Sequence, residues 1–233
     1  FQVDNTLRRA INNGEVMFVD QHLSETVEQM RNQQLKRPEV AVIEAIAITE
    51  DGGIIPTTSV GNSASLALFA DKIIVEINTS LDPAFEGLHD IFIPGQRPTR
   101  QPIPLTQIDE RIGTTAIQVD PARIVGIVFN DTDDSPSTVT APDDETQGIA
   151  NHLIAFFEKE VAAKRLPANL GPLQAGIGSI ANAVLTGLKD SNFENLVMYS
   201  EVLQDCTFEL IDAGKMTFAS GSSITLSKEY GDK

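Results

Sequence analysis

The chain has 233 residues, of which 41% are hydrophobic and 21% charged, a composition typical of a globular protein that buries a substantial core. Its 33 acidic and 17 basic residues give a net charge of -16, which argues against binding to nucleic acid or to an anionic membrane surface. No segment approaches the roughly 20 consecutive apolar residues that cross a bilayer, and the first residues do not resemble a signal peptide.

Apolar runs alternate with helical patterns along the first half of the chain. The predicted elements are buried strands at residues 16–19, 40–48, 72–77 and 124–129, helices at residues 24–35 and 63–70, and a tight turn at residues 51–53. Ser24 is placed to cap the first of these helices. The alternation predicts an α/β fold with open, mostly parallel sheets and flanking helices.

Two stretches interrupt this pattern. Residues 78–119 are rich in proline, yet apolar residues stay interleaved, so we expect an ordered excursion rather than a linker. Residues 130–142 are acidic, contain proline and lack apolar periodicity. They predict a boundary between two domains, residues 1–135 and residues 136–233.

The second half of the chain predicts a helix followed by a strand–turn–helix–strand–helix unit. Asp143 or Asp144 caps the first helix, whose apolar stripe is Ile149, Leu153, Phe156, Phe157 and Val161. The unit that follows has strands at residues 172–175 and 196–199 and helices at residues 179–188 and 204–213. Right-handed crossover makes these two strands parallel.

A glycine-rich turn lies between the strand and the helix of this unit: Gly176-Ile177-Gly178-Ser179-Ile180-Ala181. Glycines let a ligand approach the backbone, and the N-terminus of the following helix offers free N–H groups to an anion. Glu201 ends the next predicted strand, 25 residues beyond Gly176.

The residue types alone leave three interpretations of this turn and Glu201. In a dinucleotide-binding domain, an acid about 20 residues after the glycines binds the adenosine ribose. Alternatively, Glu201 is a nucleophilic carboxylate in covalent catalysis. In the third interpretation the glycines only permit a tight turn, and Glu201 is an acid ahead of a helix.

The sequence around both features resembles one known family. The two specific blocks are residues 172–184, which read Pro-Leu-Gln-Ala-Gly-Ile-Gly-Ser-Ile-Ala-Asn-Ala-Val, and residues 198–205, which read Met-Tyr-Ser-Glu-Val-Leu-Gln-Asp. Supporting stretches are residues 43–45, 56–61, 86–90 and 142–146. Over essentially the whole chain, this sequence resembles the acetyl-CoA hydrolase/transferase family of class I CoA-transferases.

The resemblance implies an acyl-CoA:carboxylate CoA-transferase, or a thioester hydrolase as its close variant. It implies that Glu201 forms a glutamyl-CoA thioester, that Ile177 supplies an oxyanion N–H, and that the turn lines coenzyme A through Gly176, Ile177, Gly178, Ser179 and Ile180. Acyl-CoA and short carboxylates such as acetate and succinate are then substrates, with no prosthetic group and no metal. A homodimer is expected for the full-length protein.

Family members are about twice as long as this chain and have two similar α/β domains. The chain therefore resembles the end of the first domain and the start of the second, and we expect it to be an inactive segment of a longer enzyme. A non-catalytic dinucleotide-binding module remains the alternative.

Several residues that attract notice are expected to have no catalytic role. His22, His89 and His152 have no partner at metal-binding spacing, and Arg97 and Arg100 are expected to be structural or solvated. The lone cysteine, Cys206, is expected to be a buried thiol, and a single cysteine fits a reducing cytoplasmic location.

Overall fold

The computed structural model describes residues 4–22, 24–133, 142–227 and 230. The chain divides into two compact units, Phe1–Arg37 and Pro38–Lys233, and both sheets lie in the second unit.

The first unit contains two short helices, α1 (Asn5–Asn12) and α2 (Glu25–Arg31). The predicted helix at residues 24–35 is confirmed but is shorter, and Ser24 occupies its N-cap position without a side-chain hydrogen bond. The strand predicted at residues 16–19 is wrong. This run is exposed, and Met17 reaches 90% exposure. None of the strands that the structure describes pairs with it, and a strand needs a neighbour to satisfy its backbone groups.

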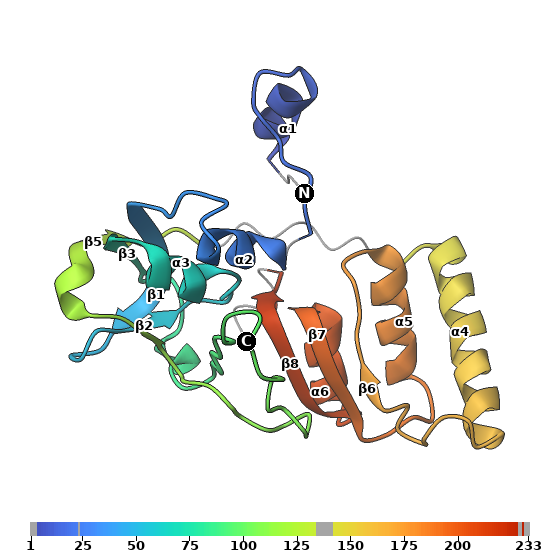
Figure 1. Cartoon of the computed structure of the whole chain (residues 1–233). Helices are drawn as coiled ribbons and strands as arrows, with labels where there is room; N and C mark the ends of the chain where they lie inside the picture. The colour runs from blue at the N-terminus through green and yellow to red at the C-terminus, as the bar shows by residue number, and fades with distance from the viewer. Residues whose placement is uncertain (1–3, 23, 134–141, 228–229, 231–233) are drawn as a thin grey trace. The chain divides into compact units, whose positions relative to one another are not determined.

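A five-stranded sheet with the order β4-β2-β1-β3-β5 begins the second unit (Figure 1). Its strands are β1 (Val40–Ile48), β2 (Gly53–Pro56), β3 (Lys72–Asn78), β4 (Ile117–Gln118) and β5 (Ile124–Asn130). The strands β1, β3 and β5 are parallel, as the sequence predicts, and the turn at residues 51–53 closes an antiparallel hairpin between β1 and β2. The strand β2 itself was not predicted.

Helix α3 (Ser63–Phe69) contributes to the core of this sheet through Ala64 and Ala67. Ile43, Ile73 and Val75 form the centre of the same core and are almost wholly buried. The strand predicted at residues 124–129 is present, but the prediction that it is buried is wrong. The strand β5 forms, but it is the edge of the sheet, and Phe129 is 73% exposed.

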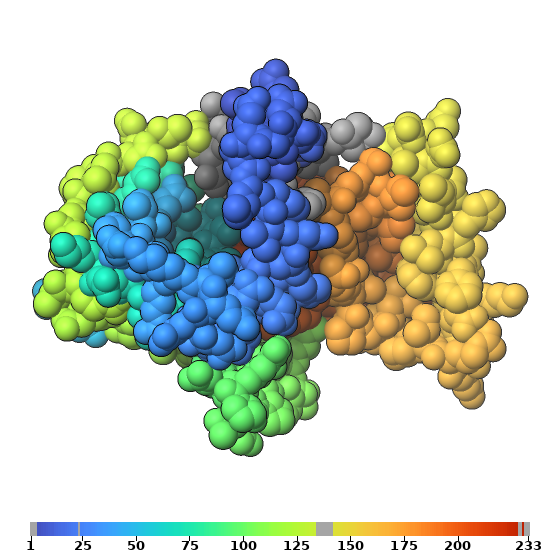
Figure 2. Space-filling model, turned by 45° about the horizontal axis from the view of Figure 1, so that its top comes forward, coloured from blue at the N-terminus to red at the C-terminus, as the bar shows by residue number. Residues whose placement is uncertain are grey.

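The proline-rich excursion is ordered, as predicted, and part of it stands out from the surface in green in Figure 2. It contains the 3-10 helix η1 (Pro83–Phe85), and a second 3-10 helix, η2 (Pro121–Arg123), follows it. The Asp90 carboxylate accepts hydrogen bonds from the backbone N–H groups of Ile112 at 3.1 Å and Gly113 at 2.6 Å. These bonds fasten the two arms of the excursion together.

A second sheet, wholly parallel, has the order β6-β7-β8. Its elements are α4 (Asp144–Ala162), β6 (Pro172–Leu173), α5 (Ser179–Lys189), β7 (Leu196–Gln204), α6 (Asp205–Asp212) and β8 (Met216–Thr225). The parallel pairing of β6 and β7 is confirmed, but β6 stops two residues earlier than predicted and β7 runs five residues further. The strand β8 was not predicted, because its run of Ala, Ser, Gly and Thr lacks a clear apolar alternation.

Helix α4 packs on the core of the second sheet through Ile154, Phe157 and Val161. The predicted stripe is therefore rotated from the real one. Phe157 and Val161 belong to the buried face, whereas Ile149 and Phe156 are exposed. Positions 150, 154, 157 and 161 share one face of a 3.6-residue helix, and Ala150 at the start of that face is fully buried.

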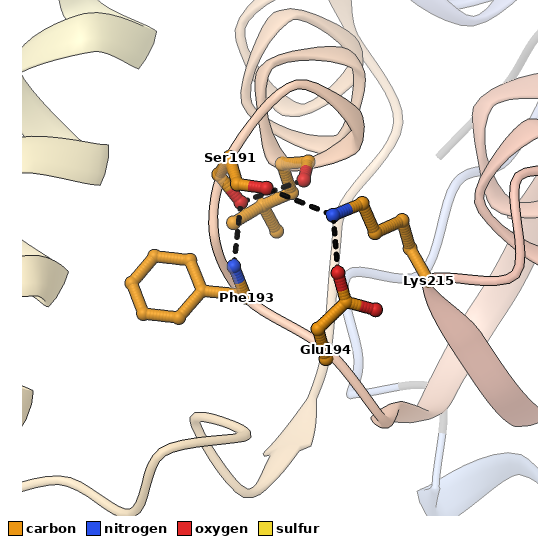
Figure 3. Close-up of polar contacts among 5 residues, drawn as sticks. Ser191, Phe193, Glu194 and Lys215 are labelled. Carbon is orange, nitrogen blue, oxygen red and sulfur yellow. Dashed lines mark hydrogen bonds and ion pairs between the residues drawn. The ribbon is translucent and has the colours of Figure 1, made fainter.

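The connection between α5 and β7 is fixed by Lys215, which precedes β8 (Figure 3). Its ammonium group donates to the Ser191 carbonyl at 2.9 Å and lies 2.6 Å from the Glu194 carboxylate. The Ser191 hydroxyl donates to the Leu188 carbonyl at 2.7 Å and accepts from the Phe193 N–H at 3.2 Å. These contacts determine where the chain enters β7.

In the sequence, the strands of the first sheet precede the predicted boundary at residues 130–142, and those of the second sheet follow it. Part of this boundary lies outside the described residues. The fold class is confirmed as α/β with mostly parallel sheets. The assignment of residues 1–135 and 136–233 to two domains of a larger enzyme stays a prediction.

Of the two predicted caps, Asp143 and Asp144, Asp143 caps α4, and it does so with a complete capping box that gives a pH-dependent contribution to stability. Hydrogen bonds from the backbone N–H of Thr146 and from its hydroxyl hold the pKa of Asp143 below its ordinary value of 3.8. A carboxyl group whose pKa is lowered by folding stabilises the protein above its unfolded pKa, and this stabilisation is lost as the pH falls through the folded pKa.

We therefore predict that Asp143→Asn, which keeps a capping oxygen but does not titrate, differs from the wild type mainly near neutral pH. The difference in melting temperature between the two proteins should shrink as the pH is lowered from about 7 to about 3. Thermal denaturation followed by circular dichroism measures it. A difference that stays constant over this range would contradict the role given to the ionised carboxylate.

Candidate active site

The glycine turn begins where the ladder between β6 and β7 ends. Residues 174–178 leave β6, and Gly178 forms the N-cap position of α5 with φ 139° and ψ 167°. This region of backbone space is essentially closed to residues with a side chain. The sequence prediction of a glycine-dependent strand-to-helix turn is confirmed at Gly178. At Gly176 no positive φ is found.

Glu201 lies within β7 rather than at its end, which corrects the prediction. The strand continues for three more residues to Gln204 before α6 begins. Exposed Tyr199 and Glu201 alternate with buried Ser200, so the two exposed side chains share one face of the sheet. Among the residues that the structure describes, none bonds to the Glu201 carboxylate, and the Ser222 hydroxyl donates to the Glu201 backbone carbonyl at 2.8 Å.

The pairing register aligns the segment of the turn with the strand that carries Glu201. Each residue of β6 pairs with the residue 25 positions later, Pro172 with Val197 and Leu173 with Met198. Continued along the chain, this register places Gly176 beside Glu201. Two hydrogen bonds between Ser200 and Ala175, of 3.0 Å and 3.3 Å, show that the two segments stay adjacent beyond the ladder.

A mainly apolar cavity of about 520 Å³ adjoins the turn. It is lined by residues 173–181 together with Leu153, Phe157, Val184, Leu185 and Leu188. All five predicted binding residues therefore line one cavity, Gly176, Ile177, Gly178, Ser179 and Ile180. The Ile177 side chain is 66% exposed, and Glu201 is not among the lining residues.

A second cavity, of about 550 Å³, was not predicted as a site, and Glu201 is not among its lining residues. Ser200, which precedes Glu201, Tyr199, two residues before it, and Ser222, which lies across the sheet from it, contribute to the wall of this cavity. Its remaining wall comes from residues 57–65, 85–93 and 108–111, with further residues of β7, α6 and β8.

The second cavity forms where the two sheets meet. The Ile224 N–H donates to the Thr58 carbonyl at 2.8 Å, and the Val60 N–H donates to the Ser222 carbonyl at 3.1 Å. Ser59 and Ser223 form an antiparallel bridge between them. Residues 58–60, which follow β2 of the first sheet, therefore pair with the edge of β8 in the second sheet.

His89, for which no catalytic role was expected, lines the second cavity. Its Nε2 lies 2.9 Å from the Thr57 carbonyl, and it must be the donor because a carbonyl only accepts. The Arg111 guanidinium donates to the Gly87 carbonyl at 2.7 Å and to the His89 carbonyl at 3.3 Å. These contacts give His89 and Arg111 a structural function, and Arg97 and Arg100 line neither cavity.

Cys206 is excluded as a nucleophile, as predicted. It is buried, and burial raises the pKa of its thiol to about 11. A thiol with this pKa stays protonated at neutral pH, and the thiolate is the reactive form.

A parallel sheet with a glycine-dependent strand-to-helix turn places the chain in the class of α/β proteins in which such turns are common ligand sites. The comparisons with known proteins narrow this class. A family model described as the acetyl-CoA hydrolase/transferase N-terminal domain matches residues 1–129. The chain therefore belongs to the acetyl-CoA hydrolase/transferase family.

Individual relatives agree with this assignment. An acetyl-CoA hydrolase of Candida albicans is 45% identical, over 98% of this chain and 45% of its own length. A succinyl-CoA:acetate CoA-transferase of Clostridium kluyveri is 42% identical, over 98% of this chain and 43% of its own. The chain spans about half the length of the curated relatives it matches.

Solved structures show the same fold. A 4-hydroxybutyrate CoA-transferase of Porphyromonas gingivalis superposes with a TM-score of 0.60 at 19% identity, over 100% of this chain and 51% of that one. Among the helices that the structure describes, none is both long and apolar enough to cross a membrane.

The two glycines of the turn allow a matched test of its geometry. We predict that Gly178→Ala destabilises the protein by about 1–3 kcal/mol, because alanine is strained at this backbone conformation. Gly176→Ala is the control, since a Cβ added there meets no atom within 4 Å and its φ is not positive. Chemical denaturation measures both variants. Equal stability of the two would contradict the structure of the turn.

Proposed function

We propose that the natural protein containing this chain is an acyl-CoA:carboxylate CoA-transferase in which Glu201 is the covalent nucleophile. The observation that carries this proposal is the exposed Glu201 carboxylate beside the Gly176–Gly178 turn, on the strand that the pairing register brings next to it. Membership of the family supports the reaction class.

The reaction needs no redox step and no external acid. A Glu201 oxygen attacks the carbonyl carbon of acyl-CoA, the C–S bond breaks, and coenzyme A leaves as a thiolate. The thiolate then attacks the glutamyl carbonyl of the resulting anhydride, and the first carboxylate is released. Glu201 now carries coenzyme A as a thioester, and a second carboxylate repeats these steps in reverse.

Both attacks develop negative charge on a carbonyl oxygen. A backbone N–H held at this oxygen can contribute about 3 kcal/mol to the transition state. We assign this role to the Ile177 N–H, because Ile177 follows the residue that the register places beside Glu201. The α5 N-terminus adds a partial positive charge on the same side of the turn. These backbone donors attract an anionic substrate locally, although the chain as a whole has a net charge of -16 and repels anions.

Hydrolysis is the close alternative at the same site. The C. albicans relative is an acetyl-CoA hydrolase and the C. kluyveri relative a CoA-transferase, so both activities occur among similar proteins. If water reaches the anhydride or the thioester, the same Glu201 chemistry becomes hydrolysis. The exclusion of water then decides between transfer and hydrolysis.

The substrates follow from the relatives' names. Acetyl-CoA or succinyl-CoA as donor, and acetate or succinate as acceptor, are the pairs we propose. Coenzyme A is then a substrate, with no prosthetic group. We further propose a homodimer located in the cytoplasm.

The dinucleotide-binding alternative fits the structure less well. In that arrangement the acid lies at the tip of the second strand, where it meets the ribose. Glu201 lies three residues before the end of β7 instead, on its exposed face. The transferase proposal needs only that the strand of Glu201 adjoins the segment of the turn, which the 25-residue register supports.

Mass spectrometry of the natural protein after incubation with acetyl-CoA or succinyl-CoA tests the proposal. We expect an adduct of the mass of coenzyme A on the peptide that contains Glu201. It should disappear in Glu201→Gln and persist in Glu158→Gln, which alters an exposed acid of α4. Turnover without any adduct on this peptide would overturn the assignment. NAD(H) binding that Glu201→Gln weakens would favour the dinucleotide alternative.

A further inference from the structure

The ladder between β6 and β7 is replaced by side-chain contacts just where the glycine turn begins. After Leu173, the backbone of Ala175 bonds to the side chain of Ser200. The Ser200 hydroxyl donates to the Ala175 carbonyl at 3.0 Å and accepts from the Ala175 N–H at 3.3 Å. A hydroxyl can do both at once, because it has one donor and two acceptor positions.

A second side chain on the same face of β7 extends this contact. Gln204 lies four residues after Ser200, and its side-chain amide approaches the Gly176 carbonyl at 3.4 Å. Ser200 is 8% exposed and Gln204 5% exposed, so water competes little for these bonds. Consecutive carbonyls, those of Ala175 and Gly176, are thus held by two buried side chains of the strand that carries Glu201.

Because side chains replace the ladder hydrogen bonds here, a backbone N–H of the turn is left free to bind a ligand. In a regular ladder the backbone would run on in a straight line and pair with β7. Here the chain is anchored at residues 175 and 176 and then diverges toward α5. Within the part of the chain that the structure describes, no group accepts a hydrogen bond from the Ile177 N–H. The anchor therefore fixes the base of the turn while its tip keeps a free donor.

We propose that Ser200 and Gln204 are positioning residues, which hold the Gly176–Gly178 turn at a fixed place beside Glu201. This inference rests on the proposed function of Glu201 as nucleophile. Ser200 is the residue before Glu201 in the chain, so the carboxylate and the anchor of the turn share one rigid strand. Misplacement of a reacting group by about 1 Å can cost on the order of 100-fold in rate.

The anchor itself can be tested without any substrate, by NMR hydrogen exchange of the Ala175 amide in the 233-residue chain. Ser200→Ala removes its acceptor, and we expect exchange at least about five-fold faster, the effect of one lost hydrogen bond. Ser200→Thr keeps a hydroxyl and should restore slow exchange. Ser222→Ala is the matched control, since it removes a hydroxyl that bonds to the Glu201 carbonyl and leaves Ala175 untouched. Unchanged exchange in Ser200→Ala would overturn the anchor.

The consequence for the reaction is tested in the natural protein. Ser200→Ala should form the coenzyme A adduct on Glu201 at least about ten-fold more slowly, with little change in the KM for acyl-CoA. Ser200→Thr should recover most of the rate, and Gln204→Ala should show a smaller loss. Adduct formation at the wild-type rate in Ser200→Ala would refute the positioning role and leave the proposed function intact. Absence of the adduct in the wild type would refute the proposed function, while the exchange result would still stand.

Discussion

The in-register parallel pairing of β6 with β7 is the constraint on which the candidate site depends. It fixes a separation of 25 residues between neighbours, and the Ser200–Ala175 hydrogen bonds keep this separation up to the residues that precede Glu201 and Gly176. Parallel neighbours with one crossover helix between them are always separated in sequence by the length of that crossover. The Lys215 contacts with Ser191 and Glu194 hold the loop between α5 and β7. The register of β6 and β7 therefore does not depend only on their two residue pairs.

The junction of the two sheets adds a second constraint. Residues 58–60 pair with the outer edge of β8, and β8 pairs with β7 along nearly its whole length. The strand β7 is therefore held by Ala175 on one side, through Ser200, and by Ser222 of β8 on the other, through the Glu201 carbonyl. The cavity of about 550 Å³ lies at this junction, and residues of the proline-rich excursion complete its wall.

The sequence predicted the fold well where one pattern dominates. The strands β1 and β3 and the helix α5 have strong apolar patterns. Asp143 is a favoured residue at the N-cap of α4, and Gly178 is the residue type that tolerates a φ of 139°. Strand β8 was missed because its side chains are small and polar, and residues 16–19 were misread because apolar residues alone do not provide a pairing partner. The Ser200 anchor could not be foreseen, because it depends on the register of two segments. The second cavity could not be foreseen either, since it joins three distant parts of the chain.

We propose that Glu201 carries coenzyme A as a thioester. Borohydride reduction measures this most directly, because it converts an acyl thioester to an alcohol but leaves a free carboxylate unchanged. After the natural protein is treated with acyl-CoA and then borohydride, peptide sequencing by mass spectrometry should find the five-carbon hydroxy amino acid at position 201 and no change without acyl-CoA. Active protein in which residue 201 remains glutamate, while another acid such as Glu194 or Glu209 is reduced, would contradict the claim.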